Sequence, residues 1–150
     1  MYKLLAHLPK NRWQPGVARL FAPDGKPLLE MPCYGKADNA RAMEAHNPDR
    51  NPTRPWGDTP AGVYAPARVT RFDPPHSTLG RYAILLEGVS GQALEAKANG
   101  RTDLAVHANR GDAKLMATYG CLRLYDRDME AVAMAVGNDL VTVKIHEQES

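Results

Sequence analysis

The sequence predicts a mainly β fold, either a sandwich or a barrel, on three observations. A hairpin pattern covers residues 17–33, further short apolar runs are bounded by Gly, Pro, Asn or Asp, and only one segment has a persuasive helical period. The chain has 150 residues, a length that suits one domain with a single core. We therefore expect residues 1–150 to form one domain with one functional site.

Composition and charge exclude several classes of protein. The 19 basic and 17 acidic residues give a net charge of +2, with no run of five like charges, which argues against a dedicated nucleic-acid binder. The apolar stretch at the N-terminus is broken by His7 and Pro9, too early for a secretion signal. No segment approaches the ~20 apolar residues of a membrane span. We expect a soluble chain whose export route is not visible in the sequence.

The strand predictions begin with the hairpin. In "VARLFAPDGKPLLEMPC", Asp24 and Gly25 supply the positive φ values that a tight turn between two strands requires. Later runs are rich in β-branched or aromatic residues, which favours strands. These further predicted strands cover residues 62–72, 81–89, 102–108 and 139–146.

Residues 37–60 form a connection much longer than the usual ~4–6 residues. Asp38 is placed to cap one short helix that runs through Ala45, and the rest is rich in Asn, Asp, Pro and Arg without periodicity. Such an insertion is typical of a lid or binding loop, although a plain solvated loop is the simpler interpretation. Its candidates for selecting a substrate or partner are Arg41, Arg50, Arg54 and Trp56.

The predicted helix lies in "DRDMEAVAMAVG", residues 126–137. Asp126 is a plausible N-cap, and Gly137 stands where a left-handed C-terminal residue is expected. The spacing i, i+3, i+4 and i+7 places one apolar face toward a core. That face consists of Met129, Val132, Ala133 and Val136.

Cys121, in "ATYGCLRL", is the candidate nucleophile. A cysteine attacks as its thiolate, so a catalytic one needs a nearby group, most simply an imidazole, that assists its deprotonation. His107 ends an apolar strand, from which it can point into a cleft. Gly120 would let the N–H groups of Tyr119, Gly120 and Cys121 converge on an oxyanion. In an extended segment, Arg123 would share the face of Cys121 and either raise its thiolate fraction or hold a substrate carboxylate.

Plainer interpretations compete with catalysis. A lone cysteine is often a small buried side chain, a lone histidine is often structural, and an arginine often bonds backbone carbonyls. A redox switch formed by Cys33 and Cys121 would need the two Cα atoms within ~7 Å. A zinc site built from His46, His76 or His107 lacks the usual ligand spacing.

The pattern "H-A-N…T-Y-G-C-L-R-L" resembles the signature of the L,D-transpeptidase catalytic domain, the YkuD-like family of peptidoglycan cross-linking enzymes. That signature is a strand histidine followed by [Ser/Thr]-x-Gly-Cys-x-Arg. The hairpin resembles the family's opening hairpin, "DTPAGVYA" its Thr-Pro-x-Gly strand, and residues 126–145 its closing helix and strand. The similarity spans residues 15–146 in the family's order.

The resemblance implies a β-sandwich with one helix after the catalytic Cys121, the 37–60 insertion, and a thioester mechanism without cofactor or metal. His107, steered by the backbone carbonyl of Ala108, would deprotonate Cys121. The thiolate would attack the carbonyl of the diamino acid at position three of a tetrapeptide stem and expel D-Ala. Transfer to an amine would make a cross-link, and transfer to water would trim the stem. Substrate contacts are expected from Thr118, Tyr119, Arg123, Asn109 and Trp56.

Three departures distinguish the chain from the family pattern: Ala108 stands where Gly is usual, Tyr119 where His is frequent, and the His-to-Cys loop is short. With no signal peptide visible, they suggest a specialised member that acts in the periplasm or cell wall. It would be an effector delivered by a secretion apparatus, with an immunity protein as a further partner, or a shortened exported enzyme. The alternative is an inactive fold-mate that binds peptidoglycan or a protein.

Overall fold

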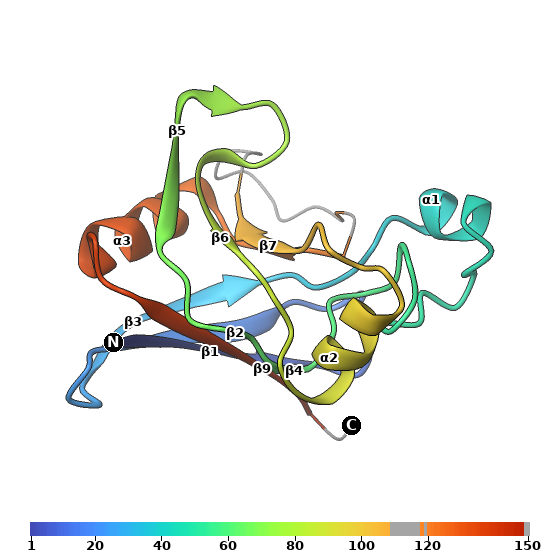
Figure 1. Cartoon of the computed structure of the whole chain (residues 1–150), viewed down its shortest axis with the longest axis horizontal. Coiled ribbons are helices and arrows are strands. Elements are labelled where there is room, and N and C mark those ends of the chain that lie inside the picture. Colours follow the sequence, from blue (N-terminus) through green and yellow to red (C-terminus); the bar gives the residue numbers. More distant parts are fainter. Residues whose placement is uncertain (109–117, 119, 149–150) are drawn as a thin grey trace.

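The computed structural model describes residues 1–108, 118 and 120–148. Two β-sheets pack face to face in a β-sandwich-like arrangement, and three helices lie at its margins (Figure 1). The predicted mainly β sandwich is therefore confirmed.

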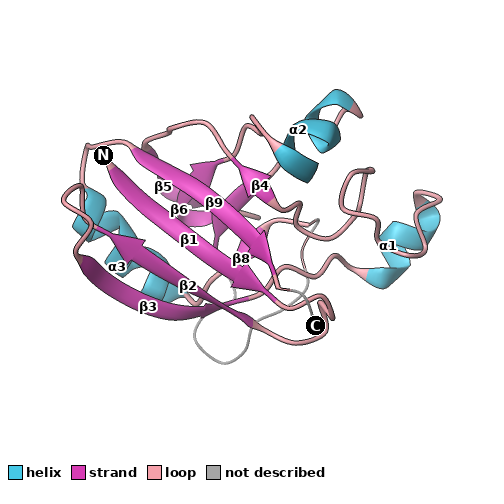
Figure 2. Ribbon diagram, turned by 90° about the horizontal axis from the view of Figure 1, so that it is seen from below, coloured by secondary structure: helices cyan, strands magenta, loops and turns pink. Residues whose placement is uncertain are grey.

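The first sheet contains five strands in the order β3-β2-β1-β9-β4 (Figure 2). The hairpin prediction is confirmed as β2 and β3. Gly25 has φ +87° in the turn, but the positive φ predicted for Asp24 was wrong, because the glycine alone takes up the left-handed conformation in this turn. The central strand β1 was not predicted, because its apolar alternation was considered only as a targeting signal. Its Leu4 and Leu8 are fully buried, and it runs parallel to β9. The strands are β1 (Tyr2–Leu8), β2 (Gly16–Phe21), β3 (Pro27–Cys33), β4 (Gly62–Val63) and β9 (Val141–Glu147).

The second sheet contains four strands in the order β5-β6-β7-β8. The prediction of one strand over residues 62–72 was wrong: β4 belongs to the first sheet and β5 to the second. Pro66, which lacks a backbone N–H, lies between them where the chain passes from one sheet to the other. The strands are β5 (Val69–His76), β6 (Gly80–Leu85), β7 (Ala105–His107) and β8 (Leu122–Arg123).

The helices are α1 (Asn39–Glu44), α2 (Gly91–Ala98) and α3 (Asp126–Val136). The capping prediction for Asp38 is confirmed, since its carboxylate accepts a hydrogen bond from the Arg41 N–H at 3.0 Å. Helix α3 was predicted correctly, but its N-cap is Tyr125 and Asp126 is its first residue. Gly137 ends it at φ +59°. Helix α2 was not predicted, and its weak amphipathic pattern explains why.

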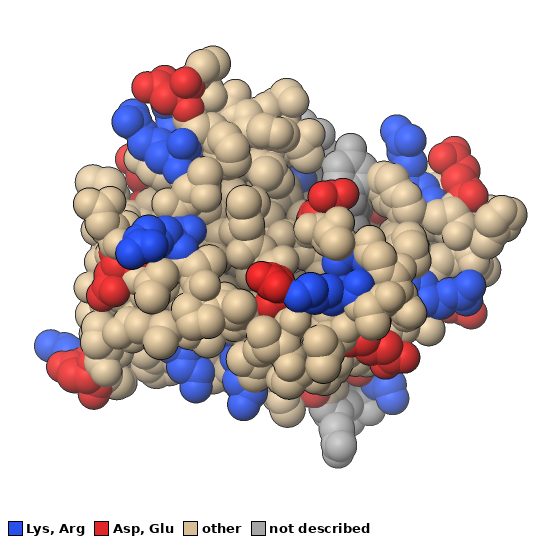
Figure 3. Space-filling view, viewed as in Figure 1, with Lys and Arg blue, Asp and Glu red and all other residues tan. Residues whose placement is uncertain are grey.

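The main core lies between the sheets and the inner face of α3. The second sheet contributes Ile84, Val106 and Leu122, and α3 contributes Met129 and Val132. Within the described residues, no helix is both long enough and apolar enough to cross a membrane. On the face shown in Figure 3, Lys and Arg side chains alternate with Asp and Glu rather than forming a continuous basic surface.

The buried face of β1 should dominate the stability of the first sheet. We expect Leu4→Ala to lower the free energy of unfolding by about 2–5 kcal/mol, because a fully buried leucine leaves a cavity when truncated. The exposed Lys3 on the same strand is the matched control, and Lys3→Ala should change it by less than about 0.5 kcal/mol. Urea unfolding of both variants measures the difference, and equal losses would contradict this placement of the core.

Candidate active site

The pairing of β7 with β8 places the candidate catalytic residues on one face of the second sheet. The two strands are parallel, with Val106 opposite Leu122 and His107 opposite Arg123. Val106 and Leu122 are fully buried in the core between the sheets. Because side chains alternate along a strand, His107, Cys121 and Arg123 belong to the opposite face.

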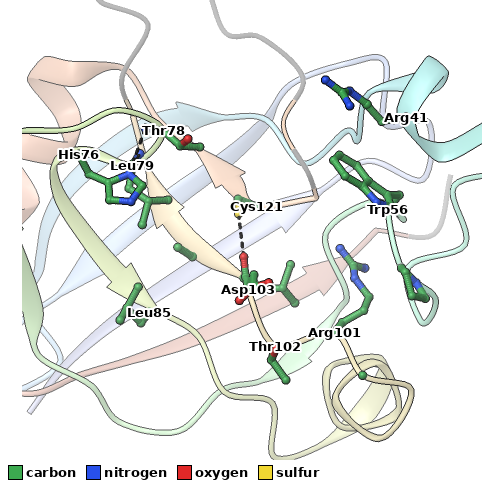
Figure 4. Close-up of a pocket in the computed structure, with 14 residues that line it drawn as sticks. Arg41, Trp56, His76, Thr78, Leu79, Leu85, Arg101, Thr102, Asp103 and Cys121 are labelled. Carbon is green, nitrogen blue, oxygen red and sulfur yellow. Dashed lines mark hydrogen bonds between the residues drawn. The ribbon is translucent and has the colours of Figure 1, made fainter. Parts of the chain in front are cut away.

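Cys121 lines a cleft of about 740 Å³ (Figure 4). Its thiol is within 3.6 Å of the Asp103 carbonyl oxygen, and only 2% of the residue is exposed. In Figure 4, Arg41, Trp56 and Arg101 lie on one side of the cysteine, and His76, Thr78 and Leu79 on the other. The cleft thus gives a ligand access to the sulfur between two walls of different chemistry.

Burial raises the pKa of the Cys121 thiol above its ordinary value. The Ala105 N–H and the charges of Arg101 and Arg123 act in the opposite direction, but desolvation outweighs them. Arg123 therefore lowers the pKa of Cys121, as expected, but by less than burial raises it. At neutral pH the neutral thiol is therefore the favoured form of this sulfur.

His107 is held by the carbonyl of the next residue. Its Nδ1 lies 2.9 Å from the Ala108 oxygen, and the ring is almost fully buried. A carbonyl can only accept, so Nδ1 carries the proton and, in the neutral ring, Nε2 has the basic lone pair. The Arg123 guanidinium donates to the same Ala108 oxygen at 2.7 Å. Arg123 thus contacts the group that fixes the histidine tautomer.

Two threonine hydroxyls fix the backbone before the cysteine. Thr118 Oγ1 accepts from the Gly120 N–H at 3.0 Å and donates to the Cys121 carbonyl at 2.9 Å. Thr59 Oγ1 donates to the Gly120 carbonyl at 2.7 Å. The Gly120 N–H is thus engaged here, whereas the Cys121 N–H has no hydrogen-bond acceptor among the described residues.

Gly120 is required by both conformation and space. Its φ is +100°, and a Cβ there would lie 2.2 Å from the Gly57 oxygen and 2.2 Å from Arg101 Nη2. The backbone oxygen cannot move aside as a flexible side chain could. A larger residue at position 120 would therefore displace the segment that carries Cys121.

Arg101 is a site residue that the sequence did not reveal. Its buried guanidinium donates to the carbonyls of Asp58 and Gly57 at 3.0 Å each, and also to that of Pro52. These contacts join positions more than 40 residues apart, so no local pattern marks the arginine. They hold part of the 37–60 insertion against Gly120, so that part is a packed element rather than a solvated loop.

The other sequence predictions fall outside the site or the described residues. Cys33 is a free thiol in the main core, whereas Cys121 belongs to a small cluster on the outer face of the second sheet, and no disulfide joins them. Burial raises the pKa of Cys33 to about 12. Among the described residues no cluster of His, Cys, Asp or Glu could hold a metal. Tyr119 and Asn109 lie outside the described residues.

Solved structures share the fold at low sequence identity. Bd1075 from Bdellovibrio bacteriovorus matches 96% of this chain with a TM-score of 0.62 and 16% identity. The helical cell shape determining protein Pgp2 from Campylobacter jejuni matches 99% with a TM-score of 0.58 and 17% identity, and its K307A mutant matches 98% at 19% identity. The chain spans 47–49% of the length of these proteins. No family model and no curated protein matches the sequence.

The reactivity of Cys121 should report its raised pKa. We expect its alkylation by iodoacetamide to accelerate with rising pH through an apparent pKa above the ~8.5 of an ordinary cysteine, because burial favours the neutral thiol. Mass spectrometry of the modified peptide gives the rate at each pH. Cys33 provides an internal control and should stay unlabelled below pH 10. A midpoint below pH 7 would show a preformed thiolate and contradict this description.

The buried Arg101 should contribute strongly to stability. We expect Arg101→Met to lower the free energy of unfolding by at least about 2 kcal/mol, because it leaves the carbonyls of Gly57 and Asp58 buried without these donors. Arg68→Met is the matched control, since this exposed guanidinium donates to one carbonyl at 3.2 Å. It should cost less than about 0.5 kcal/mol in the same unfolding experiment. Similar losses in the two variants would refute the role of Arg101.

Proposed function

We propose that this chain is a cysteine acyltransferase of peptidoglycan, with residues 1–150 forming an L,D-transpeptidase-like catalytic domain. One observation carries the proposal: Cys121 opens into a cleft on the same sheet face as His107, whose ring is held with Nδ1 protonated. The Thr-x-Gly-Cys-x-Arg motif and the fold shared with a helical cell shape determining protein support peptidoglycan as the target.

In the proposed reaction, His107 Nε2 takes the Cys121 proton as the sulfur attacks the carbonyl of the diamino acid in a tetrapeptide stem. The Cys121 N–H stabilises the resulting oxyanion. When the intermediate collapses, the carbon–nitrogen bond breaks and His107 returns the proton to the departing amine of D-Ala. A thioester remains on Cys121. Water then releases a shortened stem, or an amine of a second stem forms a cross-link.

The raised pKa of Cys121 is compatible with this sequence of steps. A general base that acts during attack does not require a stored thiolate, and Nε2 is the nitrogen left basic by the Ala108 contact. Arg123, bonded to that carbonyl, is a positioning residue in this mechanism. Thr118 and Thr59 hold the cysteine backbone in the required conformation. Tyr119, Asn109 and Trp56 stay proposed substrate contacts.

A second candidate is an inactive fold-mate that binds peptidoglycan or a protein without chemistry. The burial of Cys121 favours it, since an inert structural thiol would also show a raised pKa. The two functions differ in whether a peptide bond is cleaved. Action in the periplasm or cell wall, delivery by a secretion apparatus and inhibition by an immunity protein are further parts of the proposal.

Incubation with purified disaccharide-tetrapeptide tests the proposed function. We expect mass spectrometry to show loss of D-Ala, with a dimer in addition if an amine is the acceptor. Cys121→Ala should abolish the reaction, and His107→Ala should slow it by about 100-fold or more, because it removes the general base. His146→Ala, which removes an exposed ring from β9, is the matched control and should retain activity. If wild-type protein leaves the tetrapeptide unchanged, the acyltransferase proposal is rejected in favour of the inactive binding protein.

A further inference from the structure

One wall of the cleft is formed by two side chains from the 37–60 insertion. The Arg41 guanidinium lies over the Trp56 ring, 5.9 Å from its centroid, and both residues line the cleft that contains Cys121. Figure 4 shows the two side chains above Arg101, on the side of the cysteine opposite His76 and Leu79. A cation and an aromatic face therefore border the path to the sulfur.

The segment that carries Trp56 is held in place by buried side chains. Asn47 Nδ2 donates to the carbonyls of Asn51 and Pro55 at 3.1 Å each, and Arg101 holds the Gly57 carbonyl. The Asn47 and Arg101 side chains are both buried, although residues 51–57, which they hold, have no regular secondary structure. Trp56 itself has φ +62°, a conformation that a bulky residue adopts only when its surroundings impose it. The Trp56 ring thus lines the cleft on a backbone in an unfavourable, left-handed conformation.

The Arg41 guanidinium forms no ion pair with the carboxylates of the described residues. Its nearby counterpart Arg50 is paired with the Asp58 carboxylate at 3.1 Å. The Arg41 guanidinium, by contrast, has no carboxylate and no hydrogen-bond acceptor in the part of the chain that the structure describes, and its contact is the Trp56 ring. An exposed guanidinium beside an aromatic face is suited to bind a carboxylate.

The opposite side of the cleft combines apolar and polar side chains: Leu79 and Leu85 lie there with His76 and Thr78, and Asp103 also lines the cleft. Leu85, on β6, exposes 51% of its surface, and Leu79 packs at the margin of the small cluster around Cys121. A ligand with a negative charge beside Arg41 would keep that charge away from Asp103 and would find apolar contacts at Leu79 and Leu85. A neutral sugar would use the Trp56 face but would have no need of the Arg41 charge.

We propose that Arg41 and Trp56 form a subsite for a carboxylate that the substrate carries close to the bond attacked by Cys121. The identity of that substrate rests on the function proposed above, whereas the preference for an anion rests on the cleft alone. Arg101 and Asn47 position the subsite by holding residues 51–57.

Two alkylating reagents of similar size test this subsite without any peptidoglycan. Iodoacetate carries a carboxylate and iodoacetamide a neutral amide, so the ratio of their rates at Cys121 measures the preference for an anion. We expect Arg41→Met to lower this ratio about 2- to 5-fold at low salt, because it removes one positive charge from the cleft wall. The difference should shrink as added salt screens the charge.

Arg54→Met is the matched control, because Arg54 is exposed in the same segment but does not line the cleft. It should leave the ratio within about 1.5-fold of the wild type. If Arg41→Met and Arg54→Met give the same ratio of iodoacetate to iodoacetamide rates, the proposal is overturned. It is also overturned if the change caused by Arg41→Met is as large in high salt as in low salt. Thermal unfolding of both variants shows whether they fold, and Arg41→Lys should retain most of the preference.

The same variants separate this inference from the proposed function. If wild-type protein converts the tetrapeptide but Arg41→Met does not change the reagent ratio, the function stands and the carboxylate subsite fails. If Arg41→Met lowers the ratio but no tetrapeptide is converted, the subsite stands and the proposed function fails.

Discussion

The register of the short β7–β8 pair is the constraint on which the rest of the site depends. Side chains alternate between the two faces of a sheet, and Val106 and Leu122 lie in the core. The side chains of His107, Cys121 and Arg123 therefore lie on the other face. A slip of one residue would put the charged and titratable groups into the core. The apolar packing between the two sheets therefore specifies the chemistry on the outside of one of them.

The site consists of buried polar groups whose hydrogen bonds go mainly to backbone carbonyls. The Ala108 carbonyl accepts hydrogen bonds from His107 and Arg123, and the Gly120 carbonyl accepts one from Thr59. Carbonyls of residues 52–58 accept hydrogen bonds from Arg101. Such contacts need no second ionised side chain, so these donors are paired without the burial of an opposing charge. Burial also raises the pKa of the Cys121 thiol, which favours its neutral form.

The sequence predicted those parts of the fold that depend on local signals. The turn at Gly25, the cap at Asp38 and the apolar face of α3 are all encoded within a few residues. What it did not reveal depends on distant contacts. Arg101 bonds carbonyls more than 40 residues away, and the run 62–72 is divided between the two sheets around Pro66. For the candidate site, residue types and order were visible, whereas the walls of the cleft required the folded chain.

The parallel pairing of β1 with β9 has a consequence for how the molecule is made. Tyr2 lies opposite Val141, so one edge of the central strand β1 stays uncovered until β9 has been synthesised more than 130 residues later. During synthesis, the backbone N–H and C=O groups on that edge stay available to other chains. Contacts of such long sequence separation also slow folding. The ribosome must therefore release residues 141–147 before the first sheet can close.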